Sequence, residues 1–334
     1  MKGLVALAAG ALAGVAAEQL AVRQPWRADP YADEDFSLPR GEPHWLRASD
    51  GLELYVEVQK SDVPDAPTIV MAHGYCLNQD SWHFQRKALA GEANLILWDQ
   101  RSHGRSQRSD IENATIDQLG RDLQWVIEGF AEGPVTLVGH SMGGMTIMAL
   151  AEQFPDTIAG QVNGVALVAT SCGELSDNFI GLPAGVARRT QKAMLSLRPG
   201  ESAVGKVIQG ARYTDLNFAA TKRLSFGHGA PNSLNRFTVQ MLNATPMDTV
   251  VEFLPSLLAM DKYDSLKVLA EVPAFVTCGE SDALTPPAHT RRILQAMPQA
   301  DGEIVPNTGH MIALERNEFI TEGIRRLAFS DRFA

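Results

Sequence analysis

The chain has 334 residues, of which 45% are hydrophobic and 20% charged, and its formal net charge is −10. This length can bury a large core and predicts one large domain or two. The acidic balance argues against general nucleic-acid binding. Cys76, Cys172 and Cys278 lack the spacing of metal ligands and are interpreted as buried or semi-buried free thiols. The chain has no phosphate-loop or dinucleotide-binding motif, so the sequence predicts neither a metal nor a cofactor.

The chain begins with an apolar segment, residues 1–27, that resembles a signal or a membrane anchor. Its uncharged run, residues 3–17, follows Lys2 and is short for a complete membrane span. Val15 and Ala17 have the small-residue spacing of a signal-peptidase site. Two interpretations stay open: a membrane-associated or exported protein, and a cytoplasmic protein on whose surface this helix packs. Residues 28–43 are rich in proline and acidic side chains and are predicted to form a linker.

Strand and helix signals then alternate along the chain. Strands are predicted at 44–48, 52–58, 68–72, 94–98, 134–139, 163–169, 272–278 and 302–306. Helices are predicted at 80–90, 114–130, 142–153, 287–296 and 314–328. The later strands are continuous apolar runs, which is typical of strands covered on both faces. The pattern predicts an α/β fold with a mostly parallel, doubly wound sheet, formed by residues 44–171 and 261–334.

Between these two parts, residues 172–260 show helical spacing and no strand signal before 272. A compact fold does not need so long a loop, so we expect a helical cap. Its large apolar side chains include candidates for the substrate site: Phe179, Leu182, Met194, Phe226 and Met241. Nine basic and four acidic residues lie between positions 173 and 247. This excess of positive charge indicates either a solvated helix face or attraction to an anionic membrane surface.

The most informative motif is the G-x-S-x-G pattern around Ser141. Residues 135–144 read Val-Thr-Leu-Val-Gly-His-Ser-Met-Gly-Gly, and a helical pattern follows them. The pattern indicates a nucleophilic serine where a strand, a sharp turn and a helix follow one another, because this arrangement presents the serine hydroxyl at the end of the strand. The serine backbone is strained in such a turn, and the turn requires small residues on either side. The motif therefore predicts that Ser141 is a nucleophile.

A nucleophilic serine needs a base, and the base needs an acid that orients it. Asp282 follows the apolar run 272–278, and His310 follows the short strand predicted at 302–306. In this type of fold the order along the chain is serine, acid, histidine, which these residues match. Glu280 and Glu174 are the alternative acids, since the first is two residues away and the second follows an earlier strand.

The donors that would hold an oxyanion are also predicted. Residues 68–72 lead into the turn His73-Gly74-Tyr75. We expect the backbone N–H groups of Tyr75 and Met142 to meet at one point, where they would stabilise the negative charge that develops during acyl transfer.

These motifs resemble the α/β-hydrolase superfamily, and within it the bacterial esterase, lipase and lysophospholipase-like members with a helical cap. Further marks are Trp98-Asp-Gln-Arg-Ser-His-Gly-Arg-Ser106 and Gly309-His-Met-Ile-Ala-Leu-Glu315. In the first, Ser102 stands where the family usually has glycine. The resemblance implies a serine hydrolase of carboxylic esters. The apolar cap favours a fatty-acyl or other hydrophobic acyl ester as the substrate, such as a monoacylglycerol or a lysophospholipid.

Three other enzymes on the same triad stay open as alternatives: a cofactor-free perhydrolase, a thioesterase and a hydrolase of carbon–carbon bonds. The alternative of another class is a ligand-binding or sensing protein that keeps the hydrolase fold.

Overall fold

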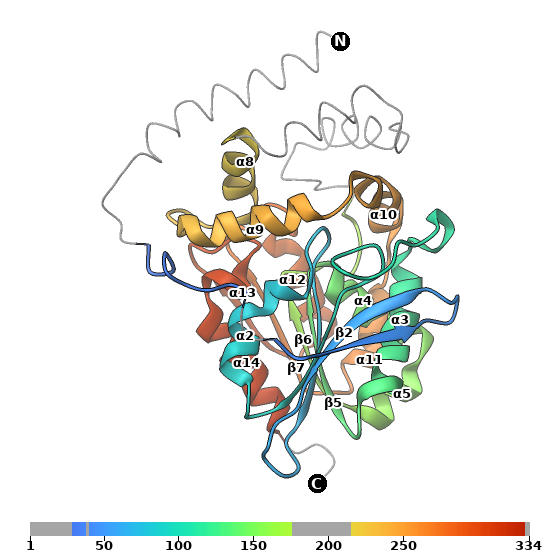
Figure 1. The fold of residues 1–334 in the computed structure, drawn as a ribbon. Helices are drawn as coiled ribbons and strands as arrows, with labels where there is room; N and C mark the ends of the chain where they lie inside the picture. Colours follow the sequence, from blue (N-terminus) through green and yellow to red (C-terminus); the bar gives the residue numbers. More distant parts are fainter. Residues whose placement is uncertain (1–28, 38–39, 176–214, 331–334) are drawn as a thin grey trace.

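The computed structural model describes residues 29–37, 40–175 and 215–330 (Figure 1). Eight strands form one sheet in the order β1-β2-β4-β3-β5-β6-β7-β8. Their bounds are β1 Glu42–Arg47, β2 Glu53–Gln59, β3 Thr68–Ala72, β4 Asn94–Trp98, β5 Val135–His140, β6 Val162–Val168, β7 Ala274–Gly279 and β8 Asp301–Val305. The β1–β2 and β2–β4 pairs are antiparallel, and all the others are parallel. The predicted mostly parallel sheet is confirmed.

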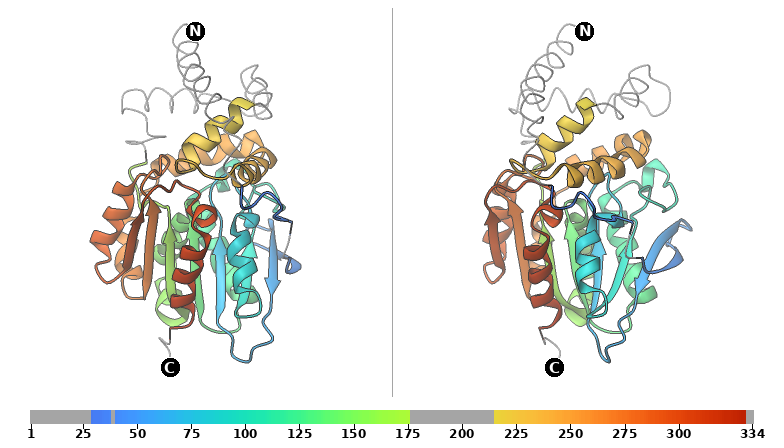
Figure 2. Two further views of the ribbon diagram at one scale, coloured as in Figure 1. Left: turned by 90° about the vertical axis from the view of Figure 1, so that its left-hand side faces the viewer. Right: turned by 60° about the vertical axis from the view of Figure 1, so that its left-hand side comes forward.

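Helices cover both faces of the sheet (Figure 2). One face carries α2 His83–Leu89, α13 Ile312–Glu315 and α14 Asn317–Ala328. The other carries α3 Ile116–Phe130, α4 Met142–Gln153, α5 Pro155–Gln161, α11 Leu266–Leu269 and α12 Pro287–Ala296. Successive side chains of β3 point to opposite faces, so Ile69 and Met71 join the core under α2 and α14, while Val70 and Ala72 join the other core. The doubly wound arrangement follows from strands that are apolar on both sides.

The helices differ from the predicted ones in a few places. The helix expected at 80–90 begins as a 3-10 turn, η1 Gln79–Trp82, and continues as α2. The helix expected at 314–328 is divided at Arg316 into α13 and α14. α5 and α11 were not predicted, because seven and four residues are too few for a helical period to stand out.

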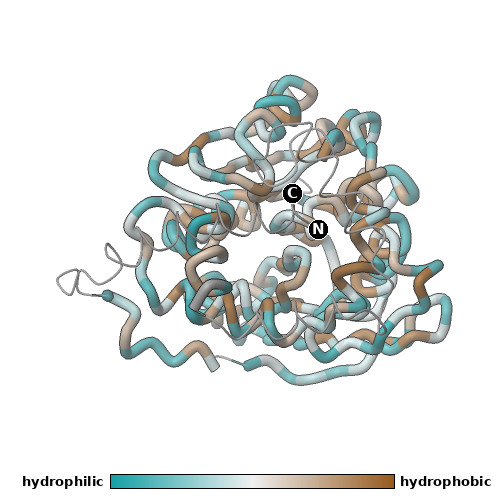
Figure 3. Tube along the Cα trace, turned by 90° about the horizontal axis from the view of Figure 1, so that it is seen from above, coloured by the Kyte–Doolittle hydropathy of each residue, from teal (hydrophilic) through white to brown (hydrophobic). Residues whose placement is uncertain are grey.

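Among the described residues between β6 and β7, three helices lie over the carboxyl edge of the sheet (Figures 1 and 2). They are α8 Asp215–Ser225, α9 Asn232–Ala244 and α10 Met247–Ala259, and we call them the inserted helices. Seen from above, hydrophobic and hydrophilic stretches alternate along the chain, as in helices that bury one face (Figure 3). The inserted helices fall within the segment predicted as a cap. The candidates Phe179, Leu182 and Met194 lie outside the described residues.

The apolar segment 1–27 also lies outside the described residues. Across the ranges that the structure does describe, no helix combines the length and the apolarity needed to cross a membrane.

Part of the predicted linker, residues 29–37, packs on the protein instead of spanning open solvent. Phe36 stacks on Phe237 of α9 with 4.3 Å between ring centroids, and Tyr31 packs on Phe84 of α2 at 5.0 Å. Asp29 accepts hydrogen bonds from the backbone N–H and the hydroxyl of Ser233, both at 2.8 Å. The proline-rich, acidic composition of residues 28–43 predicts a linker. It gives no sign of the aromatic partners of Tyr31 and Phe36, which come close only in the folded chain.

Candidate active site

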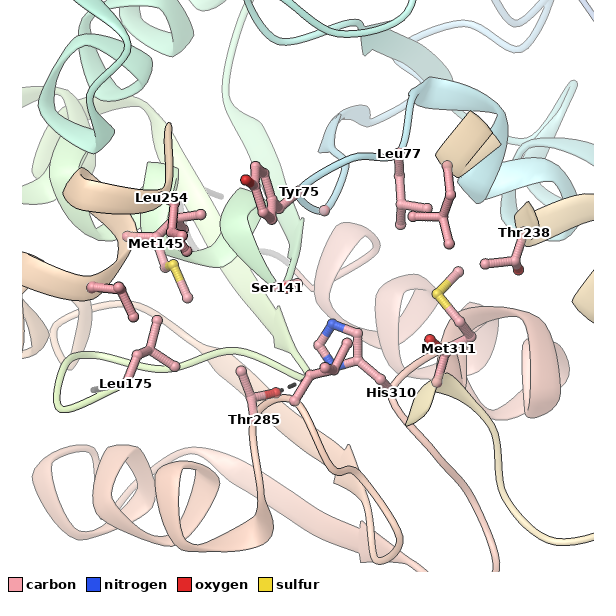
Figure 4. Close-up of a pocket in the computed structure, with 16 residues that line it drawn as sticks. Tyr75, Leu77, Ser141, Met145, Leu175, Thr238, Leu254, Thr285, His310 and Met311 are labelled. Atoms are coloured by element: carbon pink, nitrogen blue, oxygen red, sulfur yellow. Dashed lines mark hydrogen bonds between the residues drawn. The ribbon is translucent and has the colours of Figure 1, made fainter. Parts of the chain in front are cut away.

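The predicted site residues follow four strands that end at the same edge of the sheet. Tyr75 follows β3, Ser141 follows β5, Asp282 follows β7 and His310 follows β8. Because the carboxyl ends of parallel strands meet at one edge, residues far apart in sequence lie together there. In Figure 4, Ser141 and His310 lie next to each other, with Tyr75 beside Ser141.

Ser141 occupies the sharp turn that its motif predicts. Its φ of 53° and ψ of −116° are unusual for a residue with a side chain, and its backbone N–H donates to Val168 of β6 at 2.9 Å. A Cβ on Gly139 would lie 2.5 Å from the Gly143 backbone, and one on Gly143 would lie 2.1 Å from the Ala72 carbonyl oxygen. Both glycines are therefore required, and the turn presents Ser141 at the N-terminus of α4.

His310 and Asp282 form a direct pair. The Nδ1 of His310 lies 2.8 Å from the Oδ2 of Asp282, and both residues are buried. A carboxylate only accepts hydrogen bonds, so Nδ1 carries the proton. Two backbone N–H groups, those of Leu284 and Thr285, donate to the Oδ1 of Asp282 at 2.9 Å each. This arrangement leaves the Nε2 of His310 as the nitrogen able to accept a proton.

The structure does not bring the two alternative acids to His310. Glu174 has a 62% exposed side chain, which pairs with Arg292 at 2.6 Å. Glu280 is exposed and accepts a hydrogen bond from the Asn307 N–H at 3.4 Å. Of the three acids considered, Asp282 is the one that meets the histidine.

The turn that carries Tyr75 is held by buried polar groups. His73 donates from Nδ1 to the Gly74 carbonyl at 2.8 Å and accepts at Nε2 from the Gln100 N–H at 2.9 Å. Burial holds the pKa of His73 well below its usual value, which keeps the ring neutral. The Tyr75 hydroxyl donates to the Val250 carbonyl of α10. Met142 is the first residue of α4, where backbone N–H groups lack intrahelical acceptors.

Two further contacts hold the loop that carries His310. His140 donates from Nε2 to the His310 carbonyl at 2.9 Å, and burial lowers the pKa of His140 to about 3, so its ring is neutral. Glu315 accepts from the Gly309 N–H at 2.7 Å and from the Gly227 N–H at 2.9 Å. Glu315 thus joins the histidine loop to the segment that follows α8.

We expect Glu315 to make stability depend on pH. Burial raises its pKa from 4.5 to about 7, against the lowering effect of its two backbone donors. Between these values the unfolded chain releases the proton first, so this contribution to stability is lost as pH rises. The free energy of unfolding in urea, measured at pH 5 and pH 8, should fall more over this interval in the wild type than in Glu315→Gln. Equal changes in both proteins would contradict the assignment.

The loop after β4 has a structural role. The guanidinium of Arg101 is fully buried and pairs with Asp122 at 2.6 Å and with Asp50 at 2.8 Å. Ser102, which replaces the usual glycine of the family, has a φ of 66°. Its hydroxyl accepts from the Ser109 N–H at 2.9 Å, and this bond helps to hold the left-handed conformation that glycine would adopt more easily. The departure from the family motif therefore leaves the loop ordered.

A second serine–histidine pair lies away from the site. The Ser171 hydroxyl is 2.9 Å from the Nδ1 of His289, but it also donates to the Gly173 carbonyl at 2.7 Å. Both residues are buried, and neither lines the cavity described next. We therefore interpret the Ser171–His289 pair as part of a structural hydrogen-bond network.

A cavity of about 150 Å³ opens beside Ser141 and His310 (Figure 4). Its apolar wall comprises Leu77, Met145, Leu175, Leu242, Leu254, Leu257, Leu258, Leu284 and Met311. The remaining lining residues are Gly74, Tyr75, Ser141, Ser225, Thr238, Thr285 and His310. Among these described residues there is no carboxylate, lysine or arginine. The cavity suits a neutral, apolar group placed against the serine.

Phe226 and Met241, the two predicted substrate contacts within the described residues, lie elsewhere. Both are buried in an apolar cluster with Leu77, Phe84 and Leu234, and neither lines the cavity. They pack the inserted helices onto the body of the protein. Four of the nine apolar wall residues are instead leucines of α9 and α10, whose position relative to Ser141 no local sequence signal reveals.

Comparisons with known proteins identify the family. Residues 67–317 match the family described as alpha/beta hydrolase fold, so the chain belongs to that family.

Two curated relatives have names more specific than that of the family, and their sequence identity to this chain is low. The chain is 26% identical over 268 residues to the dihydrolipoyllysine-residue acetyltransferase component of the acetoin cleaving system of Pseudomonas putida, covering 78% of this chain and 62% of that protein. The chain thus spans less than two thirds of this relative. It is 24% identical over 271 residues to an sn-1-specific diacylglycerol lipase of Mus musculus, covering 77% of this chain and 80% of the lipase.

Among solved structures, an esterase from Exiguobacterium antarcticum has a TM-score of 0.71 at 20% identity. The match covers 86% of this chain and 99% of the esterase. At this identity the likeness shows the fold alone.

Proposed function

We propose that this protein hydrolyses carboxylic esters, with Ser141 as nucleophile, His310 as base and Asp282 as the acid that orients the histidine. The observation that carries this proposal is the 2.8 Å contact between His310 and Asp282, at a cavity that His310 shares with Ser141. The strained turn at Ser141 and membership of a hydrolase family support it.

In the proposed reaction, His310 Nε2 takes the Ser141 proton while the serine oxygen attacks the acyl carbon. The N–H groups of Tyr75 and Met142 hold the oxyanion, a role that fits their places after β3 and at the start of α4. The histidine then protonates the departing alcohol, which leaves an acyl group on Ser141. Water, activated by the same nitrogen, releases the acid and restores the serine. Asp282 keeps the proton of His310 on Nδ1 throughout.

The wall of the cavity supports a neutral substrate. A phosphate group would find no cationic side chain among the described lining residues, so we favour neutral esters over lysophospholipids. Similarity to a lipase named for diacylglycerol is consistent with that class. A cavity of this volume holds a group about the size of benzene, which indicates acyl chains of roughly four to six carbons.

The cavity extends to both sides of Ser141. Met145, Leu175 and Leu254 lie on one side, and Leu77, Thr238 and Met311 lie on the other (Figure 4). Leu257 and Leu258 follow Leu254 at helical spacing on α10, which extends the first, mainly apolar side. The second side contains the Thr238 hydroxyl. We assign the acyl chain to the side of Leu254 and the alcohol to the side of Thr238.

A panel of p-nitrophenyl esters from acetate to dodecanoate tests this function. We expect kcat/KM to be highest for butyrate or hexanoate, because these acyl chains fill the apolar side of the cavity. Leu254→Phe should lower kcat/KM for hexanoate about tenfold, since the larger ring occupies that side, and should change acetate hydrolysis less than about threefold.

Leu242→Phe is the matched control, because Leu242 lines the cavity one helical turn after Thr238 on α9, and so on the second side. It should leave the ratio of hexanoate to acetate hydrolysis close to that of the wild type. A panel on which no ester is hydrolysed would refute the proposed function. A chain-length profile that changes with Leu242→Phe but not with Leu254→Phe would reverse the assignment of the two sides.

A further inference from the structure

Thr285 is a residue that the proposed mechanism does not use, yet its hydroxyl lies at the centre of the site. Thr285 belongs to the loop between β7 and α12 and lines the cavity, and only 3% of its surface is exposed. The hydroxyl lies 3.0 Å from the Oδ2 of Asp282 and 3.3 Å from the Nδ1 of His310. It also lies 2.9 Å from the carbonyl oxygen of Ala169. Figure 4 shows Thr285 directly beside His310.

These contacts complete the hydrogen bonding of Asp282. Its Oδ1 receives the N–H groups of Leu284 and Thr285, and its Oδ2 receives the Nδ1–H of His310. The Thr285 hydroxyl is the second donor available to Oδ2, which shares the single hydroxyl proton with the Ala169 carbonyl. With donors on both oxygens, the carboxylate cannot rotate about its terminal torsion without losing hydrogen bonds in a buried place, where a lost bond is costly.

The third contact anchors the same hydroxyl to a neighbouring strand end. Ala169 directly follows β6, has a φ of 46° and donates its N–H to the Thr277 carbonyl of β7 at 2.7 Å. Val168, the residue before it, accepts the Ser141 N–H. The hydroxyl therefore lies between the carboxylate of Asp282, the ring of His310 and the strand end that supports Ser141, and its one proton is shared by the two oxygen acceptors.

We propose that Thr285 is a positioning residue, whose hydroxyl fixes Asp282 and His310 relative to the strand end beside Ser141. This inference rests on the proposed function. A misplacement of about 1 Å at a reacting group can cost on the order of 100-fold in rate, so loss of the hydroxyl should be measurable as a loss of kcat.

Isosteric and conservative substitutions separate positioning from packing. Thr285→Val keeps the shape and removes the hydroxyl, and we expect kcat for p-nitrophenyl butyrate to fall about 10- to 100-fold. KM should change less than about twofold, because the cavity keeps its shape. Thr285→Ser restores the hydroxyl and should recover kcat to within about threefold of the wild type. A role in packing alone would give the opposite order, since valine fills the space better than serine.

Thr136→Val is the matched control. Thr136 is a buried threonine of β5 whose hydroxyl has no hydrogen-bond partner among the described residues, so its loss should leave kcat unchanged.

If Thr285→Val fails to fold, Thr285→Ser and Thr285→Ala make the same comparison, because they differ by one oxygen atom. Equal kcat for the variants with and without a hydroxyl, in a wild type that hydrolyses the ester, would overturn this inference alone. An inactive wild type would instead overturn the proposed function.

Discussion

Replacing Ser141 by alanine is expected to abolish ester hydrolysis and leave the fold intact. The change removes the oxygen that would form the acyl-enzyme, and the loss of a comparable nucleophile lowers kcat on the order of 10⁶-fold. Alanine adds no bulk to the turn at Ser141, so the thermal unfolding midpoint should stay within a few degrees of the wild type. The rate of p-nitrophenyl butyrate hydrolysis by purified Ser141→Ala is the measurement.

Ser171→Ala is the control for this experiment, because the hydroxyl of Ser171 contacts a histidine, His289. It should keep most of the wild-type rate, since Ser171 does not line the cavity. A Ser141→Ala preparation that keeps a tenth of the wild-type kcat would exclude Ser141 as the nucleophile. Loss of activity in Ser171→Ala alone would move that role to the second pair.

Replacing Asp282 by asparagine should lower kcat about 10⁴-fold, the second largest effect. The amide nitrogen can occupy the place of Oδ2 and donate to Nδ1, which stabilises the wrong tautomer of His310 and puts the proton on Nε2. The side chain keeps its size, so binding of a short ester should change little. The measurement is kcat for p-nitrophenyl butyrate under saturating substrate.

Glu174→Gln and Glu280→Gln are the paired controls, because both residues were candidates for the same role. Each should keep a rate close to that of the wild type, since neither meets His310. An inactive Glu174→Gln beside an active Asp282→Asn would assign the orienting acid to the loop after β6.

Sequence patterns were sufficient where a local signal determines the structure. β3 and β4 match their predicted bounds, because each is an apolar run that ends at a polar turn. The two glycines of the motif predict the turn at Ser141, and the fold has no room for a Cβ atom at either position. Asp282 and His310 were found because each follows a strand signal, and the structure brings them into contact.

Patterns failed where a residue depends on partners far away in the chain. Thr285 reads as a loop threonine, and its contacts with Ala169 and His310 exist only after the sheet has formed. Phe226 and Met241 are as apolar as the leucines of the cavity wall, and helical spacing cannot tell packing from binding. The sequence assigns Tyr31 and Phe36 to a linker, because their aromatic partners lie on α2 and α9, far away in the chain.

The proposed function depends most directly on Ser141 as the reactive nucleophile. A fluorophosphonate reacts with a serine that an adjacent histidine activates, and it forms a stable covalent adduct. Peptide mapping by mass spectrometry after treatment of the full chain therefore identifies the reactive side chain. We expect one adduct per chain, on the peptide that contains Ser141, and none in Ser141→Ala. An unlabelled wild type, or an adduct on Ser171 or any other residue, would contradict the proposed function.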